Sequence, residues 1–195
     1  MVASGANANV SIEDVSNARP LMRETDILLV QLECPLETVS EAIELAKAYD
    51  VPVVLNPAPA QVLPQSLLKN IDYLTPNQHE LLQLVEKEDA EAAIAELQKS
   101  GVKNLVVTMG ANGARVISDN IDQHLPADEV TAVDTTAAGD AFNGALAVAL
   151  AEGKPLIEAV RYGMAAGALA STKRGAQPSL PSRDSVENFL ASRNY

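Results

Sequence analysis

One carboxylate of this chain follows a run of small residues, at a point where a loop is expected to become a helix. Asp140 comes directly after Ala137, Ala138 and Gly139, and an Ala/Leu-rich run follows it. The N–H groups of a helix start are unpaired and carry the positive end of the dipole, and small residues let an anion approach them. A carboxylate there can accept a proton from a hydroxyl while the N–H groups stabilise a phosphoryl group in transfer. The pattern predicts phosphoryl transfer to an alcohol, and it is equally typical of an aspartate that only caps a helix.

Four further motifs distinguish between these two interpretations. They are Asn56-Pro57-Ala58-Pro59, Thr75-Pro76-Asn77-Gln78-His79-Glu80, Thr108-Met109-Gly110-Ala111-Asn112-Gly113 and Lys173-Arg174-Gly175-Ala176-Gln177-Pro178-Ser179. Together with the stretch around Asp140, they make the chain resemble the sugar kinase family that includes ribokinases, fructokinases and adenosine kinases. The first and last of the four favour the ribokinase branch of that family. The resemblance extends from Gly5 to Leu190.

The resemblance implies a catalytic role for the stretch around Asp140. This carboxylate would accept the proton of a sugar's primary hydroxyl as that oxygen attacks the γ-phosphate of ATP. Ala137, Ala138 and Gly139 would form an anion hole with their backbone N–H groups, and Glu33 would contact the sugar. Much of the wider family has glycine where Ala137 stands, so we expect the methyl group to be tolerated if the local φ is negative.

The resemblance also implies contacts to the nucleotide and to two cations. Mg²⁺ is expected near Glu80, largely through water, because this ion commonly keeps several waters. A monovalent cation, K⁺, is expected at a site made mostly of carbonyl oxygens, with Asp134 as the charged ligand. The matching cation-site residues are Asp134, Thr136, Ala170, Lys173, Gly175 and Ser179, and the nucleotide-site residues are Asn77, Thr108, Gly110, Ala111, Asn112, Gly113, Gly139, Asn143 and Met164.

Structural explanations remain open for the same residues. Asn77 and Glu80 have the spacing of a capping arrangement at a helix start. The Asn112-Gly113 pair is typical of a hairpin turn. Asp134 is also explained as the anchor of its loop, and Met164 as an ordinary core methionine.

Composition excludes several classes of function. The 195 residues carry a net charge of −12, which disfavours non-specific binding to nucleic acid or to an anionic membrane. Aromatic residues make up only 3%, so a base-stacking surface is not expected. Cys34 is the single cysteine, so neither an intrachain disulfide nor a cysteine metal cluster is expected. We expect one domain over residues 1–195, no membrane span and a cytoplasmic location.

The elements that must position these residues alternate between strand and helix. Apolar runs predict strands at 27–32, 51–55, 72–75 and 104–109, a β-hairpin at 113–118 and 121–125, and helices between and after them. This alternation predicts an α/β fold with a mostly parallel sheet and helices on both faces. Glu33, Asn56, Asn77 and Gly110 each follow a predicted strand, and ligands of such sheets bind beyond the carboxyl ends of the strands.

Full-length members of the family begin with a region that carries further sugar contacts and a small β-sheet lid. This chain resembles only their carboxy-terminal part, so we expect the lid to be absent and the domain to be incomplete at its amino terminus. An exposed sheet edge would then favour self-association. The implied function is ATP-dependent phosphorylation of D-ribose to ribose 5-phosphate. The alternatives are a nucleotide-binding fragment without turnover, a folded remnant without a ligand, and a related sugar or nucleoside kinase.

Overall fold

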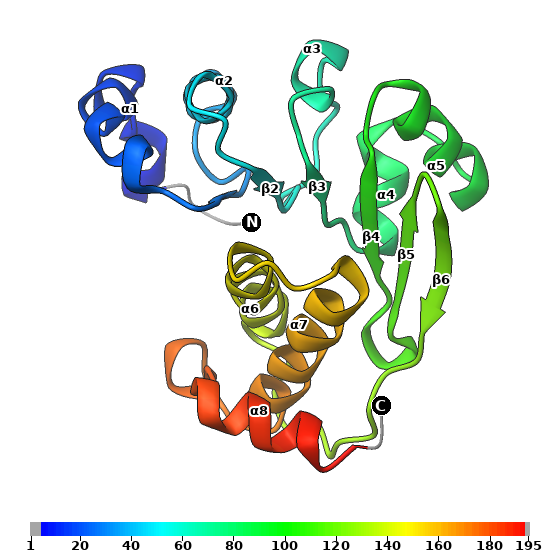
Figure 1. Cartoon of the computed structure of the whole chain (residues 1–195). Coiled ribbons are helices and arrows are strands. Elements are labelled where there is room, and N and C mark those ends of the chain that lie inside the picture. Colours follow the sequence, from blue (N-terminus) through cyan, green and yellow to red (C-terminus); the bar gives the residue numbers. More distant parts are fainter. Residues whose placement is uncertain (1–4, 194–195) are drawn as a thin grey trace. The chain divides into compact units, whose positions relative to one another are not determined.

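The computed structural model describes residues 5–193 and contains a six-stranded sheet in the order β1-β2-β3-β4-β5-β6 (Figure 1). The first four strands pair in parallel, each with the next. These findings confirm the prediction of an α/β fold with a mostly parallel sheet. The strands are β1 (Leu28–Val30), β2 (Val53–Leu55), β3 (Tyr73–Leu74), β4 (Asn104–Thr108), β5 (Ala114–Ser118) and β6 (Ile121–Leu125).

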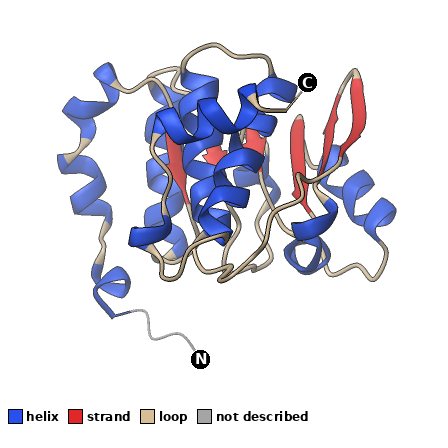
Figure 2. Cartoon of the chain, turned by 90° about the horizontal axis from the view of Figure 1, so that it is seen from below, coloured by secondary structure: helices blue, strands red, loops and turns tan. Residues whose placement is uncertain are grey.

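Helices separate the first four strands along the chain, and three more follow the last strand. Figure 2 shows the helices in blue and the strands in red. The α-helices are α1 (Ile12–Asn17), α2 (Leu36–Ala48), α3 (Gln65–Leu68), α4 (Gln78–Leu84), α5 (Ala90–Lys99), α6 (Ala138–Ala151), α7 (Leu156–Ser171) and α8 (Arg183–Ala191). Short 3₁₀ turns occur at η1 (Gly5–Asn9), η2 (Arg19–Glu24), η3 (Gly110–Asn112) and η4 (Gln177–Ser179). No helix among residues 5–193 is both long and apolar enough to cross a bilayer.

The segment before β1 is helical, which the apolar patterns did not predict. Ser11 caps α1 in a reciprocal arrangement with Asp14, whose carboxylate accepts from the Ser11 N–H at 2.8 Å. The pair has the Ser-x-x-acid spacing of a helix start, so a local signal for this helix was present in the sequence.

The chain divides into two compact units, and the division passes through β5 and β6. Unit 1 comprises Met1–Thr108 and Ile117–Ile121, and unit 2 comprises Met109–Val116 and Asp122–Tyr195. The expectation of one domain stays a prediction.

Burial in unit 1 follows the order of the strands. All three residues of β2 and Leu74 of β3 are fully buried, because inner parallel strands have both faces covered. β1 lies at the end of the sheet order, and its Leu29 is 37% exposed. Self-association through this edge stays a prediction.

In unit 2, α6 and α7 pack closely through glycines of α7. A Cβ at Gly163 would lie 2.9 Å from the Phe142 ring, and a Cβ at Gly167 would lie 3.0 Å from the carbonyl oxygen of Ala138. Helices approach this closely only where one side chain is missing. The contact at Ala138 thereby places the start of α6 directly against α7.

Candidate functional site

Polar residues gather beyond the carboxyl ends of the parallel strands, as the sequence predicts. Glu33 follows β1, Asn56 follows β2, and Asn77 follows β3. Because these strands are parallel and adjacent, the three residues lie along one edge of the sheet in unit 1. Gly110 follows β4 directly after Met109.

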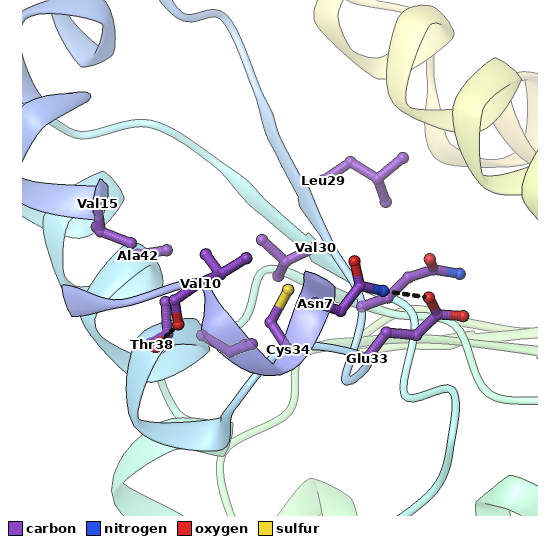
Figure 3. A pocket seen from close by; sticks show the side chains of 11 residues that line it. Asn7, Val10, Val15, Leu29, Val30, Glu33, Cys34, Thr38 and Ala42 are labelled. Atoms are coloured by element: carbon purple, nitrogen blue, oxygen red, sulfur yellow. Dashed lines mark hydrogen bonds between the residues drawn. The ribbon is translucent and has the colours of Figure 1, made fainter. Parts of the chain in front are cut away.

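Glu33 lies at the wall of a cavity of about 340 Å³. Asn7 Nδ2 donates to Glu33 Oε2 at 3.0 Å, and Figure 3 shows the two side chains directed toward each other. The rest of the wall is mainly apolar and includes Val10, Val30 and the half-buried Cys34. Sequence reasoning did not assign Asn7 to the site, because only the tertiary fold brings η1 beside the end of β1.

The start of α4 forms the capping arrangement that the sequence left open. Asn77 Oδ1 accepts from the backbone N–H groups of His79 and Glu80, both at 2.9 Å. Glu80 Oε2 in turn accepts from the Asn77 N–H at 2.8 Å. Burial raises the pKa of Glu80, and the hydrogen bond from the Asn77 N–H acts in the opposite direction. Contacts of either side chain with a nucleotide or Mg²⁺ stay predictions.

The turn after β4 also adopts its structural alternative. Met109 N–H donates to the Gly113 carbonyl at 2.8 Å, and His124 Nε2 lies 2.7 Å from the Asn112 carbonyl oxygen. Gly113 has a φ of 93°, and a Cβ at this position would overlap the carbonyl of Leu125. A glycine is therefore required here by the hairpin itself. Thr108, Gly110 and Ala111 border the same turn, and their role toward a nucleotide stays a prediction.

The start of α6 is built differently. Its N-cap, Ala137, has φ 60° and ψ 9°, and no side chain caps the helix. The negative φ on which we made tolerance of this methyl group conditional is therefore not observed. The left-handed conformation costs a residue with a Cβ about 1–2 kcal/mol.

Some of the N–H groups at this helix start already have hydrogen-bond partners. Ala138 N–H donates to the Thr135 carbonyl at 3.2 Å, and Ala141 N–H makes the first helical bond to Ala137. Gly139 N–H has no hydrogen-bond partner among residues 5–193, and a Cβ built at Gly139 would meet no atom within 4 Å. Asp140 is exposed in the same turn. An available N–H and open space at a helix start fit a phosphate group.

Two residues that the resemblance assigns to the nucleotide lie in helices of unit 2. Asn143 is 4% exposed, and its Nδ2 donates to the Gly139 carbonyl at 2.9 Å. This bond ties the side chain to the first turn of α6. Met164 is half-buried in α7. Nucleotide contacts of both stay predictions.

Asp134 anchors two segments that are distant in the sequence. Its Oδ1 accepts from the Thr136 N–H and its Oδ2 from the Gly175 N–H, each at 2.9 Å. The bonds from Gly175 and then Thr136 lower the pKa of Asp134 to about 2. The anchoring explanation is thus realised, and the carboxylate stays charged at neutral pH.

The other expected cation ligands lie at and after the end of α7. Lys173 N–H donates to the carbonyl of Ala170, and the buried Ser179 donates its hydroxyl to Ala176 at 2.7 Å. Residues 5–193 contain no cluster of three or more His, Cys, Asp or Glu side chains that could hold a metal ion. Binding of K⁺ by these residues stays a prediction.

Comparison with known proteins gives a consistent result. A family model described as pfkB family carbohydrate kinase matches residues 1–183. A ribokinase of Haemophilus influenzae is 40% identical over 97% of this chain, and one of Bacillus subtilis is 38% identical over 98%.

Solved structures agree with the sequence relatives. A ribokinase of Thermotoga maritima superposes with a TM-score of 0.89 and 41% identity over 98% of this chain. A ribokinase of Arabidopsis thaliana, in complex with ribose and ATP, gives a TM-score of 0.87 and 32% identity over 97% of this chain. In all four comparisons this chain covers 64% of the length of the relative.

Proposed function

Because the chain belongs to the pfkB family of carbohydrate kinases, we propose that it contributes to the ATP-dependent phosphorylation of D-ribose at its primary hydroxyl. The match to ribokinases supports ribose as the acceptor, and the Arabidopsis relative binds both ribose and ATP. The observation that carries the proposal is the start of α6, where the exposed Asp140 shares an uncapped turn with the available Gly139 N–H.

In this proposal Asp140 accepts the proton of the attacking hydroxyl. A proton acceptor must be reachable by the substrate, and Asp140 is exposed in the first turn of α6. The Gly139 N–H, together with N–H groups of Ala137 and Ala138, stabilises negative charge on the transferred group. Since the Ala138 N–H now bonds to Thr135, it would have to exchange that partner for the phosphate.

The cofactors of the proposed reaction are ATP, Mg²⁺ and K⁺. ATP supplies the phosphoryl group, and the cations supply neutralising charge when bound. Glu80 would hold Mg²⁺ with its second oxygen, because Oε2 already accepts from the Asn77 N–H. Asp134 would provide the charge for K⁺ beside the loop that leads into α6. Glu33 would bind the sugar, and the turn at Gly110 would face the nucleotide.

The test is a coupled assay of ribose phosphorylation by the 195-residue chain, with ATP, Mg²⁺ and K⁺. Loss of a general base typically costs about 10²–10⁴-fold in rate, so we expect that loss in Asp140→Asn. Asp184→Asn, in the first turn of α8, is a matched control that removes a carboxylate from another helix start. Equal rates for wild type and Asp140→Asn would contradict the role of Asp140.

A second candidate, nucleotide binding without turnover, is favoured by one observation. The relatives contain a third of their length that this chain does not match. Calorimetric titration with ATP and Mg²⁺ separates the candidates: binding without ribose-dependent turnover supports the second, and turnover supports the first.

A further inference from the structure

A chain of side-chain hydrogen bonds joins the carboxyl ends of the first three strands. Gln31 Nε2 donates to Asn56 Oδ1 at 2.9 Å, and Asn56 Nδ2 donates to the carbonyl oxygen of Thr75 at 3.0 Å. These residues directly follow β1, β2 and β3. One carboxamide therefore connects three neighbouring strands at the edge that bears the candidate site.

The surroundings hold this carboxamide in one orientation. Asn56 is 8% exposed and Thr75 is 1% exposed, so lost hydrogen bonds would not be replaced freely by water. A flipped amide would place its nitrogen against the amide nitrogen of Gln31 and its oxygen against the Thr75 carbonyl. Both contacts would be repulsive, so the acceptor must face β1 and the donor must face β3.

Each end of the bridge lies two residues before a candidate binding residue. Glu33 follows Gln31 at that spacing, and Asn77 follows Thr75. We infer that Asn56 is a positioning residue, which sets the spacing between the carboxylate of Glu33 on the sugar side and the helix start at Asn77 on the nucleotide side. The inference rests on the proposed function, in which these two groups bind the two substrates. Reacting groups require close alignment, so small shifts of either segment affect the reaction.

The opposite end of the same sheet supplies a matched control. Asn104 Nδ2 donates to the Asp72 carbonyl at 2.8 Å and so bridges the amino ends of β4 and β3. This carboxamide also connects adjacent strands, but no candidate residue lies at that edge. If Asn56 only supports the fold, substitutions of Asn56 and Asn104 should have similar effects on substrate binding. If Asn56 positions the binding residues, only its substitution should affect substrate binding.

The two hydrogen bonds of Asn56 can be removed one at a time. Asn56→Asp keeps an acceptor for Gln31 and replaces the donor toward Thr75 by an oxygen. Gln31→Met removes the donor toward Asn56 and leaves the bond to Thr75. We expect Asn56→Asp to raise the KM for ATP by about tenfold and Gln31→Met to raise the KM for ribose by a similar factor. Each variant should change the other KM by less than about twofold, as Asn104→Asp should for both substrates.

A second measurement needs neither ligand nor turnover. Amide hydrogen exchange, followed by mass spectrometry, reports local opening of residues 31–35 and 75–81. We expect both segments to exchange faster in Asn56→Ala and neither to change in Asn104→Ala. If Asn56→Ala does not fold, Asn56→Asp should accelerate only 75–81 and Gln31→Met only 31–35.

The two measurements separate failure of the inference from failure of the proposed function. An inactive wild-type chain would count against the function, and the exchange pattern would then decide the inference alone. An active wild type with unchanged KM values in Asn56→Asp and Gln31→Met would overturn the inference. Equal exchange in the Asn56 and Asn104 variants would overturn it as well.

Discussion

Two helices that carry candidate residues, one in each unit, begin in opposite ways. At α4, Asn77 is extended with φ −81° and its side chain accepts from two backbone N–H groups, while Glu80 returns a hydrogen bond. At α6, Ala137 is left-handed with φ 60° and offers no capping side chain. The backbone N–H groups at the start of α4 are hydrogen-bonded by side chains of the same segment, and these bonds stabilise the helix. The second leaves the Gly139 N–H available to a ligand, at a cost in backbone strain.

Among changes in stability, the largest is expected from removing the cap of α4. Asn77→Ala should lower the free energy of unfolding by about 1 kcal/mol, because two N–H groups lose their acceptor. Asp89→Ala is the control: its side chain caps α5 through the Ala92 N–H at 2.8 Å, and it should cost a similar amount. Urea unfolding measures both.

ATP affinity then decides whether the cap of α4 is more than structural. If Asn77 also faces the nucleotide, only Asn77→Ala should weaken ATP binding in calorimetric titration. Equal ATP affinities in the two variants would show that Asn77 caps α4 and does not contact the nucleotide.

A smaller effect on stability, which disappears in acid, is expected from removing the carboxylate of Asp134 in the loop before α6. The pKa of Asp134 is lowered from 3.8 to about 2, so the folded state binds this proton less readily than the unfolded chain. The contribution of the carboxylate to stability is complete above about pH 4 and is lost as the pH falls toward 2. Asp134→Asn should therefore be less stable than wild type at pH 6 and should approach it in acid. Urea unfolding at several pH values tests this, and parallel curves would contradict it.

A stabilisation of less than about 1 kcal/mol is expected from Ala137→Gly, because glycine adopts the left-handed conformation without strain but loses more entropy on folding. Glu86→Gly is the control, since Glu86 has φ 51° outside the candidate site. Urea unfolding should show similar gains for both. If the strain orders the anion-binding turn, only Ala137→Gly should weaken ATP binding. A loss of stability in Ala137→Gly alone would show that the methyl group makes a favourable contact.

The smallest change in stability is expected at Glu80. Gln is also found at this position of a capping box, so Glu80→Gln keeps the acceptor for the Asn77 N–H. Because burial raises the pKa of Glu80, the charged form costs stability as the pH rises through that pKa, and the variant avoids this cost. We expect unfolding free energies within about 0.5 kcal/mol of wild type at pH 7.

Binding of ATP with and without Mg²⁺ then separates the two roles of Glu80. The dependence of ATP affinity on Mg²⁺ should be reduced in Glu80→Gln. An unchanged dependence would assign Glu80 to capping alone.

The sequence predicted most elements within a few residues of their observed bounds. Buried strands such as Val53–Leu55 are continuous apolar runs, and α5 is bounded by its cap Asp89. The helices before β1 were missed because α1 buries none of its residues and so carries no apolar stripe. The mostly parallel pairing followed from the alternation of strands and helices, while the strand order appeared only in the fold.

The sequence by itself determined the local features of the candidate site. The three-residue spacing of Asn77 and Glu80 predicts their reciprocal capping. The position of Glu33 after a strand predicts that it lies at the carboxyl ends of the strands. Such features depend on neighbours within one turn or one strand, so the residue pattern is sufficient to specify them.

Only the tertiary structure decided which distant groups meet. Asp134 bonds to Gly175 across 41 positions, and Asn56 meets Gln31 and Thr75 across 25 and 19. The left-handed backbone of Ala137 likewise appeared only in the fold, since an alanine gives no local signal for it. The physical reason is that strand register and helix packing set these contacts and conformations, and neither is encoded in the spacing of neighbouring residues.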